Sequence, residues 1–323
     1  MAEGDQQLLS SNDDNFHDLG SDAWWSHETS WFWFSIPERG IGGWIYNWIR
    51  PNIGVSGGGC WIWDGSTFLH WEIPYFSNYH NLRLPTERDL RDFIFPSGVR
   101  VQAIVPLSKY RLSYSDHPEV EFDFTFEAVM DPWVSVDIAE SGVRHPNHFD
   151  QFGRVTGTLL LHGEKILVDC LAIRDRTWAV RSERWTRGGG YGYTSAMSES
   201  GQAFLSVGDS SAMKGFVVID GLRTAVVSGS RKVIRNPVHG WPIKVALEMR
   251  DDQGRVVEAI GTSISRVATP VPGVNGVVWT SVVDWRINGV QAWGDDQEPW
   301  PIKAWAALRR QNILLRDSPK ESG

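Results

Sequence analysis

The sequence predicts an all-β fold of the barrel or sandwich class. Short alternating or β-rich segments recur along the chain, separated by Gly, Pro, Asn and Asp, while helical periodicity is almost absent. Aromatic residues make up 12% of the 323 residues and include 18 Trp, and aromatic side chains favour strands. This length suits two domains or one large barrel.

Charge and composition exclude several classes of protein. The 31 Lys and Arg against 39 Asp and Glu give a net charge of −8, so the basic footprint of a nucleic-acid binder or an anionic-lipid binder is missing. Cys60 and Cys170 are too few for a disulfide framework. The acidic N-terminus does not resemble a signal peptide, and no apolar run reaches membrane-span length. We therefore expect a cytoplasmic protein with no membrane span.

Strands in the first half are indicated by period-2 patterns. Trp44, Tyr46 and Trp48 share one face of a strand. In residues 120–129, aromatic residues alternate with acidic residues and Thr, which is typical of a half-buried antiparallel strand. The expected strands are 31–36, 44–49, 61–63, 100–105, 109–114, 120–129 and 158–161.

Turn residues indicate hairpins in the second half. Gly163 between 158–161 and 166–170, and the pair Asp220-Gly221, suit tight hairpin turns. The later expected strands are 203–207, 215–219, 223–227, 232–235, 243–249, 256–265 and 277–286. Short helices are expected at 86–93 and 301–310, where Thr86 and Pro301 suit helix starts.

This order suggests a coarse duplication of one β domain. Residues 22–165 and 166–316 each carry enough strands for one barrel. Residues 1–21 and 317–323 are polar, and we expect them to be flexible tails.

Standard cofactor motifs are absent. The sequence has no P-loop, no dinucleotide-binding spacing, no G-x-S-x-G and no paired C-x-x-C. His145 and His148 are separated by Pro146-Asn147, which predicts a loop in place of a helical metal-ligand pair. We expect no cofactor and no metal. His148 alone could act as a general acid or base.

The densest ionic stretch is Arg174-Asp175-Arg176-Thr177-Trp178, followed by Arg181. In a strand, Arg174 and Arg176 share one face and Asp175 shares the other with Thr177. Because isolated buried charges are very costly, these side chains are either paired in a structural network or functional. The sequence leaves both interpretations open.

Trp residues concentrate in the first quarter of the chain. Each one suits ordinary core packing, but together they exceed the needs of one small core, so some are expected to line a cavity for a hydrophobic molecule. Glu28 could be a carboxylate at the mouth of that cavity or a surface residue. The Trp residues that we consider for substrate binding are Trp31, Trp33, Trp61, Trp63 and Trp71.

A family resemblance follows from these motifs. His148-Phe149-Asp150-Gln151, then Gly157 and Gly163-Glu164, then the stretch from Arg174 to Arg181, resemble hydroxyneurosporene synthases (carotenoid 1,2-hydratases) and their bacterial relatives. Glu28-Thr29-Ser30-Trp31 is similar to the opening of their first domain. Asp150 replaces an expected Glu, and Ala179 replaces the usual Gly.

The resemblance implies two packed lipocalin-like β-barrels and cofactor-independent chemistry on a large hydrophobic substrate, such as an isoprenoid, a steroid or a polycyclic aromatic compound. The expected reaction is hydration, elimination, isomerisation or cyclisation by acid–base catalysis. Asp175 is the first choice for the acid, oriented by Arg174, Arg176 and Arg181. His148 is a second choice, while Asp150, Gln151 and Trp178 are expected to bind substrate.

Two other functions remain open from the sequence. Lipocalin-like barrels need no catalytic group, so the protein could be a carrier of a hydrophobic ligand. Trp platforms also stack on sugars, so a carbohydrate-binding β-protein is a further alternative, which paired cavity carboxylates would support. The sequence does not decide the oligomeric state.

Overall fold

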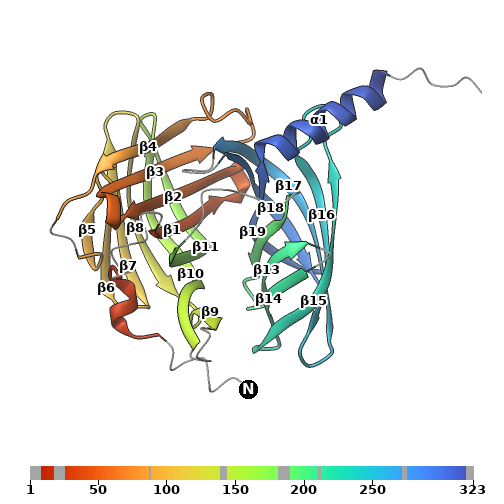
Figure 1. Cartoon of the computed structure of the whole chain (residues 1–323), viewed down its shortest axis with the longest axis horizontal. Helices are drawn as coiled ribbons and strands as arrows, with labels where there is room; N and C mark the ends of the chain where they lie inside the picture. The colour runs from red at the N-terminus through yellow and green to blue at the C-terminus, as the bar shows by residue number, and fades with distance from the viewer. Residues whose placement is uncertain are drawn as a thin grey trace, which may run out of the picture. The chain divides into compact units, whose positions relative to one another are not determined.

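In the computed structural model, the described residues are 9–17, 26–86, 89–138, 144–180, 190–209, 212–270 and 275–317. They are dominated by antiparallel strands, with three short 3-10 helices and one α-helix (Figure 1). The chain divides into two compact units, Met1–Ser182 and Glu183–Gly323. The predicted all-β, two-domain class is confirmed.

The first unit is a curled sheet in the order β4-β3-β2-β1-β11-β10-β8-β7-β6-β5, and β9 pairs with β10. The pairings between these described strands are antiparallel. Its strands are β1 (Ser26–Ile36), β2 (Ile41–Arg50), β3 (Val55–Trp63), β4 (Tyr75–Arg83), β5 (Asp92–Ile94), β6 (Arg100–Val105), β7 (Lys109–Asp116), β8 (Val120–Ala128), β9 (Trp133–Ile138), β10 (Arg144–Leu161) and β11 (Glu164–Val180). Two 3-10 helices, η2 (Pro37–Arg39) and η3 (Pro51–Ile53), separate β1, β2 and β3.

The β10–β11 hairpin decides where the first unit ends. His162 and Gly163 have φ of 50° and 82°, as a two-residue type I′ turn requires, so the predicted hairpin is confirmed. Its second strand then pairs with β1 from Phe32↔Arg174 to Ser26↔Val180. The residues just after the expected division at 165/166 are therefore a central strand of the first sheet, and the division follows Ser182.

An apolar core fills the inside of the curled sheet. Phe122, Phe124 and Phe126 of β8 are buried there, which confirms the period-2 prediction for that strand. The hydroxyls of Tyr75 in β4 and Tyr114 in β7 are hydrogen-bonded at 2.6 Å. Strands far apart in sheet order therefore face each other around this core.

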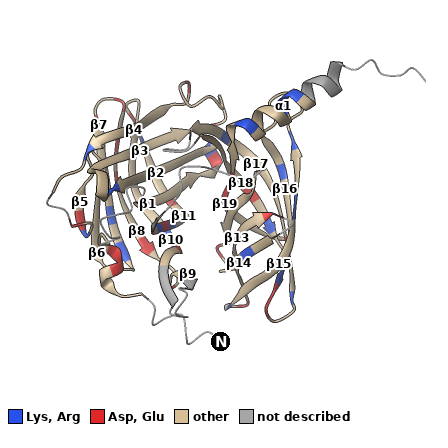
Figure 2. Cartoon of the chain, viewed as in Figure 1, with Lys and Arg blue, Asp and Glu red and all other residues tan. Residues whose placement is uncertain are grey.

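The outer side of β5–β8 is charged and exposed. Figure 2 shows acidic and basic residues interspersed there. Arg100 pairs with Asp92 and Arg111 with Asp123, in both cases between exposed side chains. Such pairs contribute little to stability, about 0–1 kcal/mol each.

Part of the expected N-terminal tail packs against the core. Residues 9–17 contain the 3-10 helix η1 (Ser11–Asp14), and Asp14 is only 3% exposed. Its carboxylate accepts hydrogen bonds from the Tyr110 hydroxyl and the Leu107 backbone N–H. This segment is therefore integral to the first unit, whereas residues 1–8 and 18–21 lie outside the described ranges.

The second unit is a closed eight-stranded barrel, β12 to β19 in sequence order. Asp220 and Gly221, with φ of 54° and 74°, form the predicted hairpin turn between β14 and β15. The strands are β12 (Gly192–Met197), β13 (Ala203–Asp209), β14 (Ala212–Ile219), β15 (Leu222–Arg235), β16 (Pro242–Asp251), β17 (Val256–Pro270), β18 (Gly276–Ile287) and β19 (Val290–Pro301).

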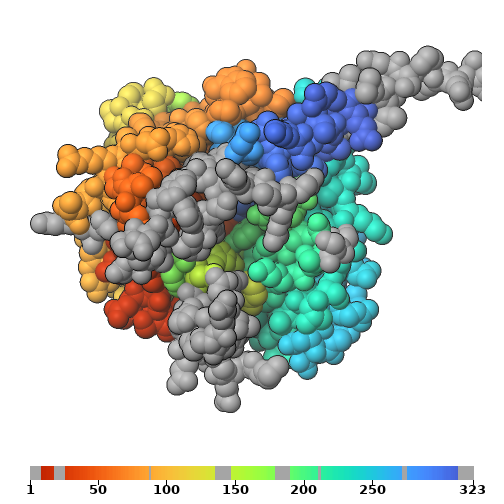
Figure 3. All heavy atoms as spheres, viewed as in Figure 1, coloured from red at the N-terminus to blue at the C-terminus, as the bar shows by residue number. Residues whose placement is uncertain are grey.

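One α-helix follows the barrel. The helix expected at 301–310 is found as α1 (Ile302–Asp317), longer than predicted, and the side chains of 302–311 form part of the surface in Figure 3. The helix expected at 86–93 is not found among the described residues of that stretch, where turns lead into β5. None of the described helices is long and apolar enough to cross a bilayer.

Candidate active site

Alternation along β11 separates the ionic stretch into two groups. Arg174 pairs in register with Phe32 and Gln151, and Asp175 pairs with Trp31 and Asp150. Because directly paired residues share a face and successive residues do not, the arginines and Asp175 lie on opposite faces of the sheet. Phe32 belongs to the apolar core, so Arg174 faces inward and Asp175 outward.

Arg174 is an anchor inside the core. Its guanidinium is 1% exposed and stacks over the Tyr110 ring, 4.0 Å from the centroid. Its Nε donates to Gln151 Oε1 at 2.8 Å, and its terminal nitrogens reach Asp14 Oδ1 at 3.3–3.4 Å. Gln151 also donates to the Leu107 carbonyl. These contacts explain how the core tolerates a buried cation.

A second buried pair involves Arg176 and Glu28. The guanidinium lies 3.1 Å from Glu28 Oε2, and this carboxylate also accepts the backbone N–H of His17. The His17 imidazole stacks on Trp178 with centroids 4.1 Å apart. Glu28, for which the sequence left open a cavity mouth or the surface, is therefore fully enclosed. Neither it nor Trp178 lies beside Asp175.

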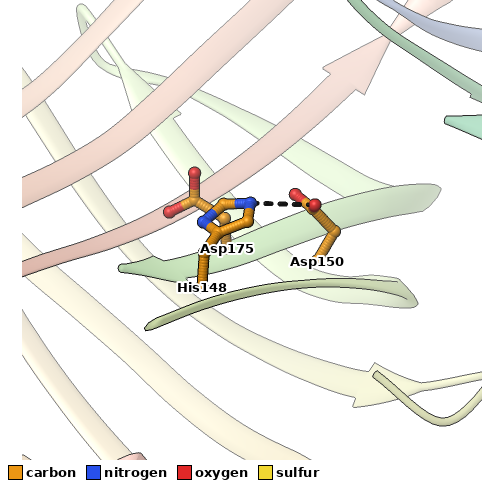
Figure 4. Close-up of side chains that lie close together, drawn as sticks. All are labelled: His148, Asp150 and Asp175. Atoms are coloured by element: carbon orange, nitrogen blue, oxygen red, sulfur yellow. Dashed lines mark hydrogen bonds and ion pairs between the residues drawn. The ribbon is translucent and has the colours of Figure 1, made fainter. Parts of the chain in front are cut away.

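The outer face of β10 and β11 brings His148, Asp150 and Asp175 together. One potential ligand atom from each lies within 4.8 Å of the others. His148 Nε2 is 2.9 Å from Asp150 Oδ2, and Nδ1 is 2.8 Å from Thr177 Oγ1. Figure 4 shows the imidazole between the two carboxyl groups. We call these three residues the His–Asp cluster.

The hydrogen bonds restrict the protonation of His148. An ionised Asp150 only accepts hydrogen bonds, so it requires a proton on Nε2. The neutral imidazole then accepts at Nδ1 from the Thr177 hydroxyl, and the imidazolium donates at both nitrogens. Asp150 is buried and His148 partly exposed. The carboxylate therefore fixes the orientation of the imidazole.

Aromatic side chains continue this face across β1, β2 and β3. Trp31 lies next to Asp175 in register, and Trp33 pairs with Trp44, which pairs with Trp61. The ring centroids of Trp31 and Trp44, and of Trp44 and Trp61, are 5.4 Å apart. We call the aromatic residues of this face the Trp face: Trp31, Trp33, Trp44, Tyr46, Trp48, Trp61, Trp63 and Phe76.

Glycines shape the Trp face. Gly57, Gly58 and Gly59 of β3 lie opposite Trp48, Asn47 and Tyr46. A Cβ atom at Gly57 would lie 2.3 Å from the Trp48 indole, and Gly58 has a φ of 97°. A larger residue at Gly57 would therefore push the Trp48 indole out of place, and any other residue at Gly58 would be strained by the positive φ and would clash with the backbone of β2.

The Trp face carries unmatched donors. The indole N–H groups of Trp33, Trp44 and Trp61 are buried and have no hydrogen-bond acceptor among the described residues. A buried donor without an acceptor costs roughly 1–3 kcal/mol. The face therefore combines apolar ring surface with N–H groups that can donate hydrogen bonds to a bound molecule or to water.

Two predicted residues have no place in this arrangement. Trp71 is 67% exposed and contacts His70, whose ring also lies 4.8 Å from that of Phe76, so Trp71 lies on the surface at the edge of the Trp face and is not one of its buried rings. Arg181 lies outside the described residues.

Residues 10–301 match the family described as Domain of unknown function (DUF7064). The chain belongs to this family. Solved structures similar to this DUF7064 member include an AttH protein from Nitrosomonas europaea, with 13% identity, a TM-score of 0.52, and coverage of 87% of this chain and 94% of that one. No curated protein sequence matches the chain.

Two further structures share the fold of this DUF7064 member. CghA in complex with Sch210972 has 10% identity and a TM-score of 0.53, covering 84% of this chain and 88% of CghA. Kievitone hydratase from Nectria haematococca has 10% identity and a TM-score of 0.54, covering 91% and 92%. At identities this low, the structural similarity establishes the shared two-domain β fold alone. The relation to hydroxyneurosporene synthases stays a prediction.

Sequence reasoning missed some residues of this DUF7064 site. Thr177 binds His148, and Trp44 lies between Trp33 and Trp61, but neither was singled out for the site. The signal for Trp44 was its period-2 spacing with Trp48. The signal for Thr177 was its place two residues after Asp175, on the same face of the strand.

The His–Asp cluster has the donor atoms for a cation. One imidazole nitrogen and two carboxylate oxygens within 4.8 Å of one another could ligate a divalent metal. In that case His148 would have to give up one of its two hydrogen bonds. The sequence predicted no metal, and chelation distinguishes the two states.

Proposed function

We propose that this protein is a lyase or isomerase that acts on a hydrophobic unsaturated substrate by acid–base catalysis at the His–Asp cluster. The observation that carries the proposal is the register: Asp175 and Trp31 are direct neighbours on one face. Proton-transfer groups and an aromatic surface therefore meet at one place. The name of the structural neighbour kievitone hydratase is consistent with this class of reaction.

Asp175 and the His148–Asp150 pair have different roles in the proposed proton transfer. Both ring nitrogens of His148 are engaged by Asp150 and Thr177. Asp175, beside Trp31, is therefore the group assigned to the substrate, and the His148–Asp150 pair holds or returns its proton. Positioned acid–base catalysis contributes roughly 10²–10⁴-fold to a rate.

Hydration illustrates the proton balance. The acid donates a proton to one alkene carbon, and a cation develops on the other. Water attacks that cation and loses its own proton to the same group, so one water molecule is added and the acid is restored. Aromatic faces such as Trp31 and Trp44 stabilise the cation by about 2 kcal/mol or more each when desolvated.

Arg174 and Arg176 are not included in this chemistry. Both face the core of the first unit and are occupied by Asp14 and Glu28. In our proposal they hold β11 in place, so that Asp175 is presented on the other face.

The test uses solvent deuterium and a matched pair of variants. Wild-type protein is incubated in D2O with a panel of prenylated, steroidal and polycyclic aromatic alkenes, and mass spectrometry detects deuterium bound to carbon. Asp175→Asn should reduce incorporation by roughly 10²-fold or more. The control Asp169→Asn removes an exposed carboxylate from the same strand and should leave incorporation unchanged.

Two outcomes would contradict the proposal. Full activity in folded Asp175→Asn would remove this residue from the mechanism. Binding of panel compounds by the wild-type protein with no deuterium incorporation would instead favour the carrier of a hydrophobic ligand.

A further inference from the structure

The barrel of the second unit contains a belt of polar side chains. Five residues follow one another across neighbouring strands in register: Arg266↔Ser281, Ser281↔Asp296, Asp296↔Thr194 and Thr194↔Ser206. Directly paired residues share a face. We call this row the polar belt.

The polar belt points into the barrel. In three of these strands, the residue two positions from the belt residue belongs to the buried apolar core of this unit: Val283, Ala196 and Phe204. Residues two apart in a strand face the same side. The belt is therefore a polar layer stacked directly on the apolar layer that fills the barrel.

Most charges in this layer are mutually satisfied. Asp296 accepts a hydrogen bond from Thr194 at 2.7 Å and pairs with Arg231 of β15 at 2.9 Å. Glu298 pairs with Arg235 at 2.6 Å and with Arg231 at 3.4 Å. Burial alone would lower the pKa of Arg231, but the two carboxylates outweigh it and raise the pKa. Two guanidiniums and two carboxylates thus form a neutral network.

Arg266 is a cation outside that network. It forms no ion pair with any carboxylate of the described ranges, and its buried Nε has no acceptor there. Burial lowers the pKa of Arg266 without an opposing carboxylate. Its guanidinium lies 4.8 Å from the Trp241 ring centroid, and it donates a long hydrogen bond, 3.4 Å, to the Ile264 carbonyl.

Ser281, which pairs in register with Arg266, carries a hydroxyl without a hydrogen-bond partner among the described residues. Its side chain is 1% exposed. A partly buried cation and a buried hydroxyl, paired in register on neighbouring strands, select for an anion that accepts hydrogen bonds from both.

Aromatic rings lie near these two groups. Trp241 and Trp279 have ring centroids 6.1 Å apart. Trp279 is two residues from Ser281 in β18, so both face the interior. The ring centroid of Trp305 in α1 lies 5.6 Å from that of Trp279, so the helix adds a third ring to this group. A flat apolar group next to the anion would contact these rings.

We propose that the interior of the β12–β19 barrel binds a small aromatic carboxylate, with its carboxylate on Arg266 and Ser281 and its ring against Trp241 and Trp279. Guanidinium and carboxylate match geometrically and form strong charge-assisted hydrogen bonds. This site uses only residues of the second unit and does not depend on the function proposed for the first.

Isothermal titration calorimetry on the full chain tests the proposal with 2-naphthoate and its uncharged analogue 2-naphthamide. Wild-type protein should bind 2-naphthoate more tightly than 2-naphthamide. Arg266→Gln should weaken 2-naphthoate about tenfold or more, as expected for a lost charged hydrogen bond, and should leave 2-naphthamide unchanged. Arg266→Lys should restore part of the affinity. The control Arg250→Gln, at an exposed position of β16, should behave like wild type.

Ser281→Ala provides an independent variant if Arg266→Gln fails to fold, and it should weaken 2-naphthoate severalfold. The proposal is overturned if wild-type protein does not bind 2-naphthoate, or if folded Arg266→Gln or Ser281→Ala binds it as wild type does. Loss of binding in Asp175→Asn, with none in Arg266→Gln, would assign the ligand to the first unit and would also overturn it.

Discussion

Replacing Arg174 with Met should destabilise the first unit severely. The substitution removes the cation but keeps an unbranched apolar chain among the surrounding rings. It leaves Gln151 Oε1 and Asp14 Oδ1 without the donor that now serves them. Breaking a buried ion pair by removing one partner costs roughly 3–5 kcal/mol. Each kcal/mol lowers Tm by about 2–4 °C in a domain of this size, so we expect a decrease of roughly 6–20 °C.

Differential scanning calorimetry measures this change against two further variants. Arg154→Met removes an arginine whose partner Asp169 is exposed, so its effect should stay within about 1 kcal/mol. Asp14→Asn combined with Arg174→Met should cost less than the sum of the single changes, because the two residues interact directly. If Arg174→Met shifts no transition by more than about 2 °C, the assignment of Arg174 as a structural anchor is refuted.

Three further outcomes are expected. Burial raises the pKa of Asp295 to about 7, although Ser195 and Gln297 donate hydrogen bonds to its carboxyl group. In the unfolded chain the pKa of an Asp is about 3.9. Because the folded pKa is the higher one, the stability that the protonated Asp295 contributes should be lost as the pH rises through 7. Tm should therefore fall between pH 5 and 8, and this fall should be smaller in Asp295→Asn. Gly57→Ala should cost roughly 1–3 kcal/mol in guanidinium unfolding, because its Cβ would clash with the Trp48 indole; wild-type stability would contradict the account of the Trp face. Exhaustive chelation should leave deuterium incorporation intact, and a loss restored by one specific divalent ion would show that the His–Asp cluster holds a metal.

Local patterns predicted the parts of the fold that depend on neighbouring residues. Period 2 identified the buried side of 120–129, and turn residues identified the hairpins at Gly163 and Gly221. Alternation also separated Arg174 from Asp175 correctly. These features depend on strand geometry alone, which any short segment carries.

The order of the strands in the sheet could not be predicted from the sequence. The pairing of β1 with β11 joins residues about 150 positions apart, and no local signal specifies it. Asp175 was therefore expected to be oriented by the arginines of its own strand, whereas its neighbours in space are Trp31 and Asp150. The same limitation placed the domain division before β11.

The candidate site was predicted in part. His148, Asp150 and Asp175 were selected by residue type and motif, and the structure brings them together. Glu28, Gln151 and Trp178 were selected in the same way but face the core. The two groups differ in the face of the sheet that they occupy. The inner face has ionic partners such as Asp14, which was predicted from the sequence to lie in a flexible tail.

The contact between Asp14 and Arg174 has a consequence for the chain while it is being synthesised. The two residues are 160 positions apart, so the ribosome produces the acidic segment long before its cation exists. During that interval β1 has its β2 partner but lacks β11, and its other edge remains open. Open strand edges invite pairing with other chains. Nascent chains paused before residue 164 should therefore depend on chaperones far more than chains released after residue 182.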